Sequence, residues 1–164
     1  MDEIRLKKWV LSRRDSLALI SSIESILGIS LTLPRSAQAS CEEPEEGMAF
    51  VHFDEIAFIR TGSSFIPFLG SSAALSLFPT AVVDEGAIRY LLNGADVMRP
   101  GLKVLPDWGE VGRTVVVKEE KKGRAIAVGA SLVKGEEAIR MSKGPCLRNL
   151  HYVGDRYWNL FKMV

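Results

Sequence analysis

The chain is poor in the residues that most often build reactive or metal centres, and it has no long hydrophobic run. Cys41 and Cys146 lie far apart and follow no metal-ligand spacing, which favours two free thiols in a reducing compartment over a disulfide. Two histidines without companions do not make a zinc site. No apolar stretch is long enough to span a membrane, so we expect no membrane contact and a cytoplasmic location.

A recognisable catalytic set is also missing. The glycines between residues 94 and 112 follow neither the Walker nor the dinucleotide-binding pattern. Cys146, His151 and Asp155 could be drawn as a cysteine-nucleophile triad, but they lie close together in sequence and no oxyanion loop accompanies them. The sequence therefore argues against a stand-alone enzyme, and we expect no cofactor.

What the chain does contain is enough material for one large domain or two small ones. It has 164 residues, of which 47% are hydrophobic and 25% charged, as in an ordered globular protein. The net charge of +1 hides an asymmetry, because residues 1–78 carry 7 Lys and Arg against 10 Asp and Glu, whereas residues 79–164 carry 14 against 10. A mildly basic second half is compatible with nucleic acid without demanding it.

The first half begins with a stretch that imitates a twin-arginine signal peptide, with Arg13-Arg14, an apolar run and a small-residue site at 37–39. The same residues predict a soluble helix more strongly. Ser12 and Asp15 form a capping pattern, and apolar residues recur at helical spacing up to Leu27, before Gly28. We therefore expect a helix from about Arg13 to Leu27.

The rest of this half predicts a small sheet. We expect strands over Ile4–Leu11, Ile29–Leu33, Met48–Phe53, Glu55–Thr61 and Ser64–Leu69, with a hairpin turn at Thr61-Gly62-Ser63. The acidic stretch Arg35–Gly47 is interpreted as a solvated loop. We expect five phenylalanines, at positions 50, 53, 58, 65 and 68, to form its core.

The second half is denser in strand patterns. A short helix is expected over Asp84–Asn93, with Ala87, Ile88, Leu91 and Leu92 facing inward. Further expected elements are a strand start at Leu102–Leu105, β-rich runs at Thr114–Lys118 and Arg124–Leu132, a helical turn at Gly135–Met141, and a last hairpin of His151–Val153 with Tyr157–Phe161. Several short strands with two short helices indicate a compact module resembling a closed β-barrel.

The loop after the short helix is the strongest candidate for a binding site. Gly94 can take a positive φ as the helix ends, and Met98-Arg99-Pro100-Gly101 fixes a turn whose exposed residues can approach a phosphate backbone. Arg99 is expected to be free to pair with phosphate. On the residues alone, a plain chain reversal explains the glycines equally well.

Four separated motifs in order resemble the PUA domain, which is named for pseudouridine synthases and archaeosine transglycosylases. They are VDEGAIRYLLNGADVMRPGL (Val83–Leu102), IAVGASLV (Ile126–Val133), SKG (Ser142–Gly144) and NLHYVGDRYWNL (Asn149–Leu160). The whole chain also resembles archaeal relatives of the malignant-T-cell-amplified-sequence translation factor, in which a pre-PUA domain precedes the PUA domain. The resemblance implies an α+β protein, with a small helix-and-sheet domain at 1–78 and a mixed β pseudobarrel with two short helices at 79–164.

The resemblance also implies that structured RNA binds to the helix, the glycine loop and a late strand. Carried over to this sequence, it selects Gly94, Ala95, Asp96, Met98, Arg99, Pro100, Gly101, Lys143, Gly144, His151 and Tyr152. Val83, Ala87, Val97, Trp158 and Leu160 match as core. Possible phosphate contacts are Arg89, Arg113, Lys121, Lys122, Arg124 and Arg148, with Lys121 and Lys122 better explained as a solvated hairpin tip.

Three functions remain open at this point. The favoured one is a non-enzymatic RNA-binding protein that contacts tRNA or ribosomal RNA in translation. The second is an RNA-targeting subunit for a separate RNA-modifying enzyme. The third is a protein-interaction adaptor that uses the acidic stretch or the first sheet to bind a translation factor or an RNA-modifying protein.

Overall fold

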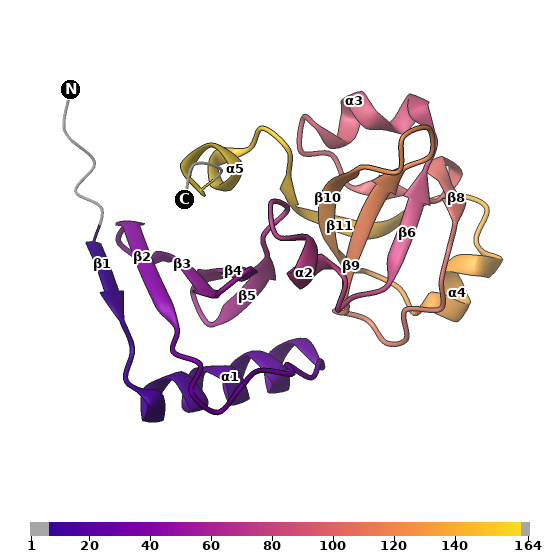
Figure 1. Cartoon of the computed structure of the whole chain (residues 1–164). Helices are drawn as coiled ribbons and strands as arrows, with labels where there is room; N and C mark the ends of the chain where they lie inside the picture. The colour runs from indigo at the N-terminus through magenta and orange to yellow at the C-terminus, as the bar shows by residue number, and fades with distance from the viewer. Residues whose placement is uncertain (1–6, 162–164) are drawn as a thin grey trace, which may run out of the picture. The chain divides into compact units, whose positions relative to one another are not determined.

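The computed structural model describes residues 7–161, which divide into two compact units between Leu77 and Phe78. The first unit combines an antiparallel sheet with two helices, and the second a nearly closed mixed sheet with short helices (Figure 1). The predicted α+β class is confirmed. Among the described residues, no helix has both the length and the apolar character that crossing a membrane requires.

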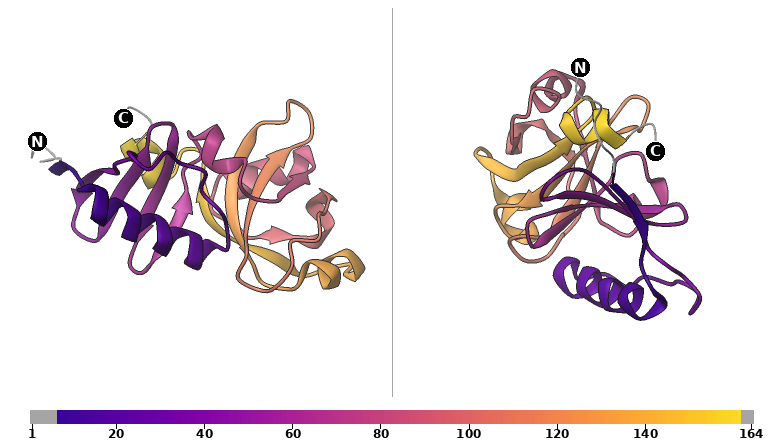
Figure 2. Two further views of the ribbon diagram at one scale, coloured as in Figure 1. Left: turned by 60° about the horizontal axis from the view of Figure 1, so that its bottom comes forward. Right: turned by 90° about the vertical axis from the view of Figure 1, so that its left-hand side faces the viewer.

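The first unit is a five-stranded antiparallel sheet in the order β1-β2-β3-β4-β5. Its elements are β1 (Lys7–Val10), α1 (Arg13–Leu27), β2 (Ser40–Glu45), β3 (Met48–Phe53), β4 (Ile56–Thr61), β5 (Ser64–Pro67) and α2 (Ser72–Leu75). Helix α1 lies across one face of the sheet (Figure 2). The predicted meander of β3, β4 and β5 is confirmed, and all five phenylalanines expected in its core are buried.

Helix α1 confirms the predicted bounds because local signals define both of its ends. The Ser12 hydroxyl accepts a hydrogen bond from the Asp15 backbone N–H at 3.0 Å, and Gly28 ends the helix at φ 66°. The strand expected at Ile29–Leu33 is absent. Instead, the Ile29 N–H bonds the Glu24 carbonyl and the Leu31 N–H bonds the Glu24 carboxylate, so the helix end satisfies these amides.

The solvated loop predicted over Arg35–Gly47 is wrong for residues 40–45. Residues Ser40–Glu45 form β2, which pairs with β1 on one side and β3 on the other. The pairing places Glu42 beside Phe50 and Lys8, where Glu42 is only 6% exposed and its Oε1 lies 3.7 Å from the Lys8 Nζ. Strand pairing with distant residues thus overrides the local acidic composition. Of the strand expected at Ile4–Leu11, residues Lys7–Val10 form β1 and Leu11 lies beyond its end. Residues 4–6 lie outside the described residues.

The second unit is a six-stranded sheet in the order β7-β11-β10-β9-β6-β8, in which only β6 and β9 are parallel. Its elements are β6 (Thr80–Val83), η1 (Glu85–Ala87), α3 (Ile88–Leu91), β7 (Val97–Met98), η2 (Arg99–Gly101), β8 (Leu102–Val104), β9 (Thr114–Glu119), β10 (Ala125–Ser131), α4 (Gly135–Arg140), β11 (Pro145–Tyr152) and α5 (Arg156–Phe161). The core is built around Val83, Val97, Val115, Val117, Ala127 and Leu147, all less than 3% exposed.

Two predictions for this unit need correction. The helix expected over Asp84–Asn93 is a turn of 3₁₀-helix followed by the short α3, and Leu92 is 37% exposed instead of facing inward. The expected last hairpin is a strand followed by a helix, β11 and α5. The Asp155 carboxylate accepts a hydrogen bond from the Trp158 N–H at 2.8 Å, which caps a helix where the sequence pattern predicted a strand.

Candidate nucleic-acid interface

A groove of about 510 Å³ lies between α3 and the segment that follows it. Its lining residues are Asp84, Gly86, Ala87, Tyr90, Leu91, Ala95, Asp96, Val97, Met98, Pro100 and Gly101. We call this the α3 groove. Five of the eleven predicted site residues, at positions 95, 96, 98, 100 and 101, therefore line one concave surface.

Local backbone chemistry gives the groove its shape. Helix α3 ends through hydrogen bonds from the Gly94 N–H to the Leu91 carbonyl and from the Ala95 N–H to the Tyr90 carbonyl, both 3.0 Å. Gly94 has φ 87°, and a Cβ there would lie 3.4 Å from the Tyr152 ring, so glycine suits both the backbone and the space. The chain then enters β7, where Val97 is 2% exposed and anchors the loop in the core.

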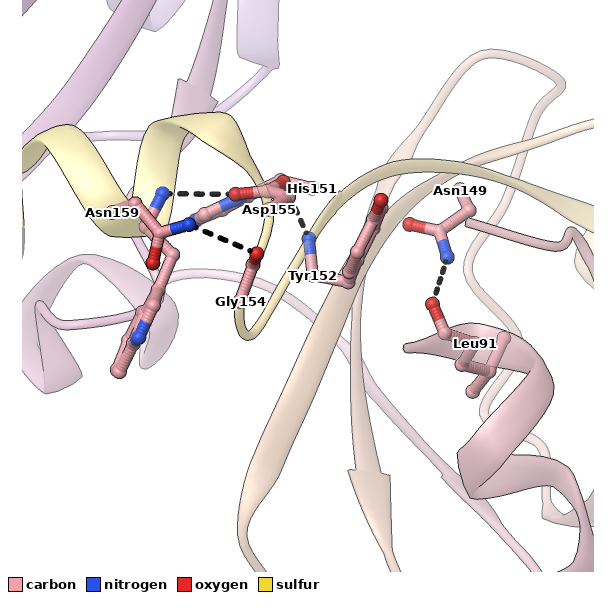
Figure 3. A network of polar contacts seen from close by, with 8 residues as sticks. Leu91, Asn149, His151, Tyr152, Gly154, Asp155 and Asn159 are labelled. Atoms are coloured by element: carbon pink, nitrogen blue, oxygen red, sulfur yellow. Dashed lines mark hydrogen bonds and ion pairs between the residues drawn. The ribbon is translucent and has the colours of Figure 1, made fainter. Parts of the chain in front are cut away.

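Asn149 ties this loop to β11. Its Nδ2 donates to the Leu91 carbonyl at 3.0 Å (Figure 3). The same Nδ2 donates to the Ala95 carbonyl at 3.0 Å, and the Asn149 backbone N–H donates to the Asp96 carboxylate at 3.0 Å. Both walls of the α3 groove are thereby held by one strand residue. The sequence offered no sign of this role, because it depends on which segments are neighbours in space.

Arg99 is not free to pair with phosphate, and that prediction was wrong. Its Nε donates to the Ala138 carbonyl at 2.8 Å, and its Nη1 lies 3.4 Å from the Leu102 carbonyl. The backbone N–H of Arg99 also donates to the Gly144 carbonyl at 2.8 Å. The guanidinium therefore joins the end of α4 to the loop, since cations at a helix C-terminus satisfy its last carbonyls.

The lining of the α3 groove contains no lysine or arginine. Its two carboxylates serve the backbone: Asp84 caps Ala87 and Asp96 receives the Asn149 N–H. Exposed apolar surface comes from Tyr90, at 55%, and Met98, at 48%. A flat apolar group such as a nucleobase suits this surface better than a phosphate does.

A cation lies at the rim of the α3 groove. The Arg89 guanidinium donates from Nη2 to the Tyr90 hydroxyl at 2.8 Å and lies 4.8 Å from the ring centroid. This contact orients an exposed aromatic ring and a positive charge together on α3. Tyr90 was not among the predicted site residues, although an exposed aromatic in a short helix beside a glycine loop is a signal that could have found it.

The late-strand candidates are divided by their exposure. Lys143 is exposed and Gly144 has φ 102° in the turn before β11, while Tyr152 is half-buried beside Gly94. His151 is fully buried, so its side chain forms no part of an exposed contact surface, contrary to the prediction. Its Nδ1 lies 2.8 Å from the Asp155 carboxylate, in the network that starts α5 (Figure 3).

Asp155 is the centre of this network. Its carboxylate also accepts the backbone N–H groups of Tyr152 and Trp158, at 2.9 and 2.8 Å. Burial opposes the charged form, but the hydrogen bonds from His151 and from the Trp158 N–H outweigh it, so the pKa of Asp155 lies below its ordinary value. The group is structural, because it closes the turn between β11 and α5.

The cysteine considered as a nucleophile lies in the core of the second unit. Cys146 is fully buried, and burial raises the pKa of its thiol, which disfavours the reactive thiolate. Within residues 7–161, no group of three or more His, Cys, Asp and Glu side chains could hold a metal ion.

Comparisons with known proteins agree with this geometry. A model of the PUA domain matches residues 79–153. An uncharacterised protein of Methanocaldococcus jannaschii is 33% identical over 96% of this chain and 98% of its own. Translation machinery-associated protein 20 of Saccharomyces cerevisiae is 32% identical over 77% of this chain and 75% of its own. A hypothetical protein of Pyrococcus horikoshii OT3 has a solved structure with a TM-score of 0.77 at 27% identity, covering 94% of this chain and 99% of that one.

The mixed sheet, the α3 groove and the matched residues define a PUA-domain protein, a class whose PUA domains bind RNA. The full-length similarity narrows this class further. The chain belongs to the family that contains translation machinery-associated protein 20, the malignant T-cell-amplified sequence proteins and their archaeal relatives. This membership confirms the resemblance noted in the sequence.

Proposed function

We propose that this protein is a non-enzymatic RNA-binding protein of translation, which holds an unpaired nucleotide of tRNA or ribosomal RNA in the α3 groove. In this proposal, residues 79–164 are the RNA-binding domain and residues 1–78 a pre-PUA domain. The protein acts in the cytoplasm. Family membership supports the setting, because translation machinery-associated protein 20 is named for its association with translation.

The observation that carries the proposal is the pairing of an uncharged concave surface with an exposed aromatic ring. Tyr90 and Met98 contribute apolar surface on opposite walls of the α3 groove, and Arg89 lies next to the Tyr90 ring. A base can stack on the face of the Tyr90 ring that Arg89 does not cover, while its phosphate contacts the guanidinium. Base stacking together with a phosphate contact suits a single-stranded end or loop, since bases in a duplex are already stacked on each other.

Of the predicted contacts, the proposal keeps those that line or border the groove. The α3 groove is shaped by Gly94, Ala95, Asp96, Met98, Pro100 and Gly101. The Tyr152 ring lies next to Gly94. Lys143 and Gly144 remain candidate contacts on the turn before β11. Arg99 acts by holding the loop, and His151 by holding the start of α5.

The test is binding of fluorescent tRNA and of small-subunit ribosomal RNA fragments, measured by anisotropy. Base stacking contributes about 1–3 kcal/mol per base, so Tyr90→Ala should weaken binding about fivefold or more. Met98→Ala should weaken it less. Ile139→Ala is the matched control for Met98, because Ile139 is an apolar side chain of the same unit with 50% exposure and lies outside the groove.

Two results would overturn the proposal. One is undetectable binding of the wild-type protein to both RNAs. The other is equal affinity for Tyr90→Ala, Met98→Ala and Ile139→Ala, since RNA would then bind elsewhere. Recovery of an RNA-modifying enzyme and no ribosomal material in a pull-down would favour the targeting-subunit alternative.

A further inference from the structure

A second groove, of about 520 Å³, lies on the other flank of α3. Its lining residues are Glu85, Ile88, Leu92, Glu119, Lys121, Lys122, Arg124, Ala125, Ile126, Val153 and Trp158, all in the second unit. We call it the hairpin groove, because the turn between β9 and β10 forms its rim. None of these residues was predicted to be in a binding site except as dispersed phosphate contacts.

The rim is built by one buried carboxylate. Glu119 is 5% exposed, and its two oxygens accept the backbone N–H groups of Lys121, Lys122 and Arg124 at 2.9–3.1 Å. The N–H groups of Arg124 and Lys122 lower the pKa of Glu119 below its ordinary value, so the carboxylate is ionised at neutral pH. The hairpin tip is exposed to solvent, as the sequence predicted, and these bonds give it a defined shape as well.

The three cationic side chains at this rim differ in whether they form an ion pair. The Lys121 Nζ lies 2.7 Å from the Glu85 carboxylate, which links the tip to η1. Lys122 and Arg124 are exposed and, among the described residues, neither forms an ion pair. Two exposed cations without an ion pair thus line the same groove as apolar side chains that include the 37% exposed Leu92. Such a surface is complementary to a ligand with both an anionic and a flat apolar part.

Helix α3 connects the two grooves. Ile88 and Leu92 face the hairpin groove, while Ala87 and Tyr90 face the α3 groove. Arg89 and Tyr90 are both exposed on the helix between them. An α-helix with its side chains is only about 10 Å across. One extended strand can therefore reach from the Tyr90 ring past Arg89 to Lys122 and Arg124.

We propose that the hairpin groove binds the next nucleotides of the same single-stranded RNA, with phosphates at Lys122 and Arg124 and a base or ribose over Ile88 and Leu92. The inference rests on the proposed function, because it extends the strand held in the α3 groove. It assigns the RNA a path across α3. Single-stranded sites on other folds span roughly 4–16 nucleotides, a length that allows both grooves to be filled.

The experiment compares oligonucleotides of about 4 and about 12 nucleotides, binding to wild type, to Lys122→Gln/Arg124→Gln and to Lys103→Gln/Arg140→Gln. The last variant is the matched control, because it removes the same charges from exposed positions of the same unit outside both grooves. We expect the first double variant to bind the long oligonucleotide about tenfold more weakly and the short one almost normally. Its salt dependence should lose about 1.4 in slope, or 0.7 per phosphate.

The outcomes separate the two proposals. If wild type binds neither oligonucleotide, the proposed function fails. If wild type binds and Tyr90→Ala weakens both lengths, but the two double variants behave alike, only the second groove is refuted. Displacement of RNA by polyglutamate as efficient as by unlabelled polynucleotide would also overturn the inference, because the rim would then be a general anion surface. Urea unfolding of each variant controls for folding.

Discussion

Replacing Asn149 tests whether one side chain holds both walls of the α3 groove. Asn149→Ala removes two 3.0 Å hydrogen bonds to the carbonyls of Leu91 and Ala95. Each such bond contributes about 0.5–1.5 kcal/mol net. The variant should therefore lower the free energy of unfolding by about 1–3 kcal/mol. The bond from the Asn149 backbone N–H to Asp96 remains.

Asn149→Asp is the sharper perturbation because it keeps the shape and reverses the hydrogen-bonding role. The amide must point Nδ2 toward the two carbonyls, since the flipped orientation would place the amide oxygen against two carbonyl oxygens. An introduced carboxylate faces those same carbonyls with no proton to donate. We expect it to destabilise by about 1 kcal/mol more than alanine does. Because the facing carbonyls raise the pKa of the introduced carboxyl group, the difference should narrow as the pH falls toward about 4, where the group is protonated and can donate again.

The assay is urea unfolding followed by tryptophan fluorescence, since Trp108 and Trp158 both belong to the second unit. Asn159→Ala is the control, because its amide makes a single exposed bond of 3.2 Å to the Gly154 carbonyl (Figure 3). RNA affinity should fall severalfold in both Asn149 variants, as binding must then order the loop. Stability of Asn149→Asp equal to wild type at pH 7 would refute the assigned amide contacts.

Three further predictions follow from single contacts. Arg99→Lys should lower stability by about 1–3 kcal/mol and weaken RNA binding without changing its salt dependence, because the guanidinium binds carbonyls and not phosphate; a shallower salt slope would contradict this. The pKa of Asp155 is lowered in the folded state, so its carboxylate stabilises the protein above its ordinary pKa of 3.8, and this stabilisation is lost as the pH falls through the lower folded value. In Asp155→Asn, the free energy of unfolding should therefore depend less on pH over that acid range. An unchanged pH profile would refute this role. Gly135→Ala should destabilise the protein by about 1–3 kcal/mol, because the new Cβ would lie 2.5 Å from the Trp108 backbone nitrogen. Thermal unfolding measures this, and an unchanged unfolding temperature would show that the segment shifts freely.

Local signals explain which elements were predictable. Helix α1 follows from the Ser12 cap, the apolar spacing and Gly28, all within its own stretch of chain. The meander of β3, β4 and β5 follows from its apolar runs and turns. Strand β2 and helix α5 were missed because pairing with β1 and β3, and a cap from Asp155, outweigh their local composition.

The candidate site shows the same division. Gly94 and the turn at 98–101 were recognised from residue type, because a positive φ and a tight turn have few solutions. The partners of Arg99 and Asn149 were not, since those bonds join residues 39 and 58 positions apart. The burial of His151 depends on the packing of β11 and on Asp155.

The sequence by itself determined the family, the first helix, most strands and the location of the loop beside α3. Helix spacing, strand alternation, caps and glycine turns act over a few residues, so they can be recognised without coordinates. Only the tertiary structure decided that Tyr90 is exposed, that Arg99 is committed and that Glu119 shapes a second groove. Exposure and hydrogen-bond partners depend on which distant segments pack together, and that packing is a property of the folded chain.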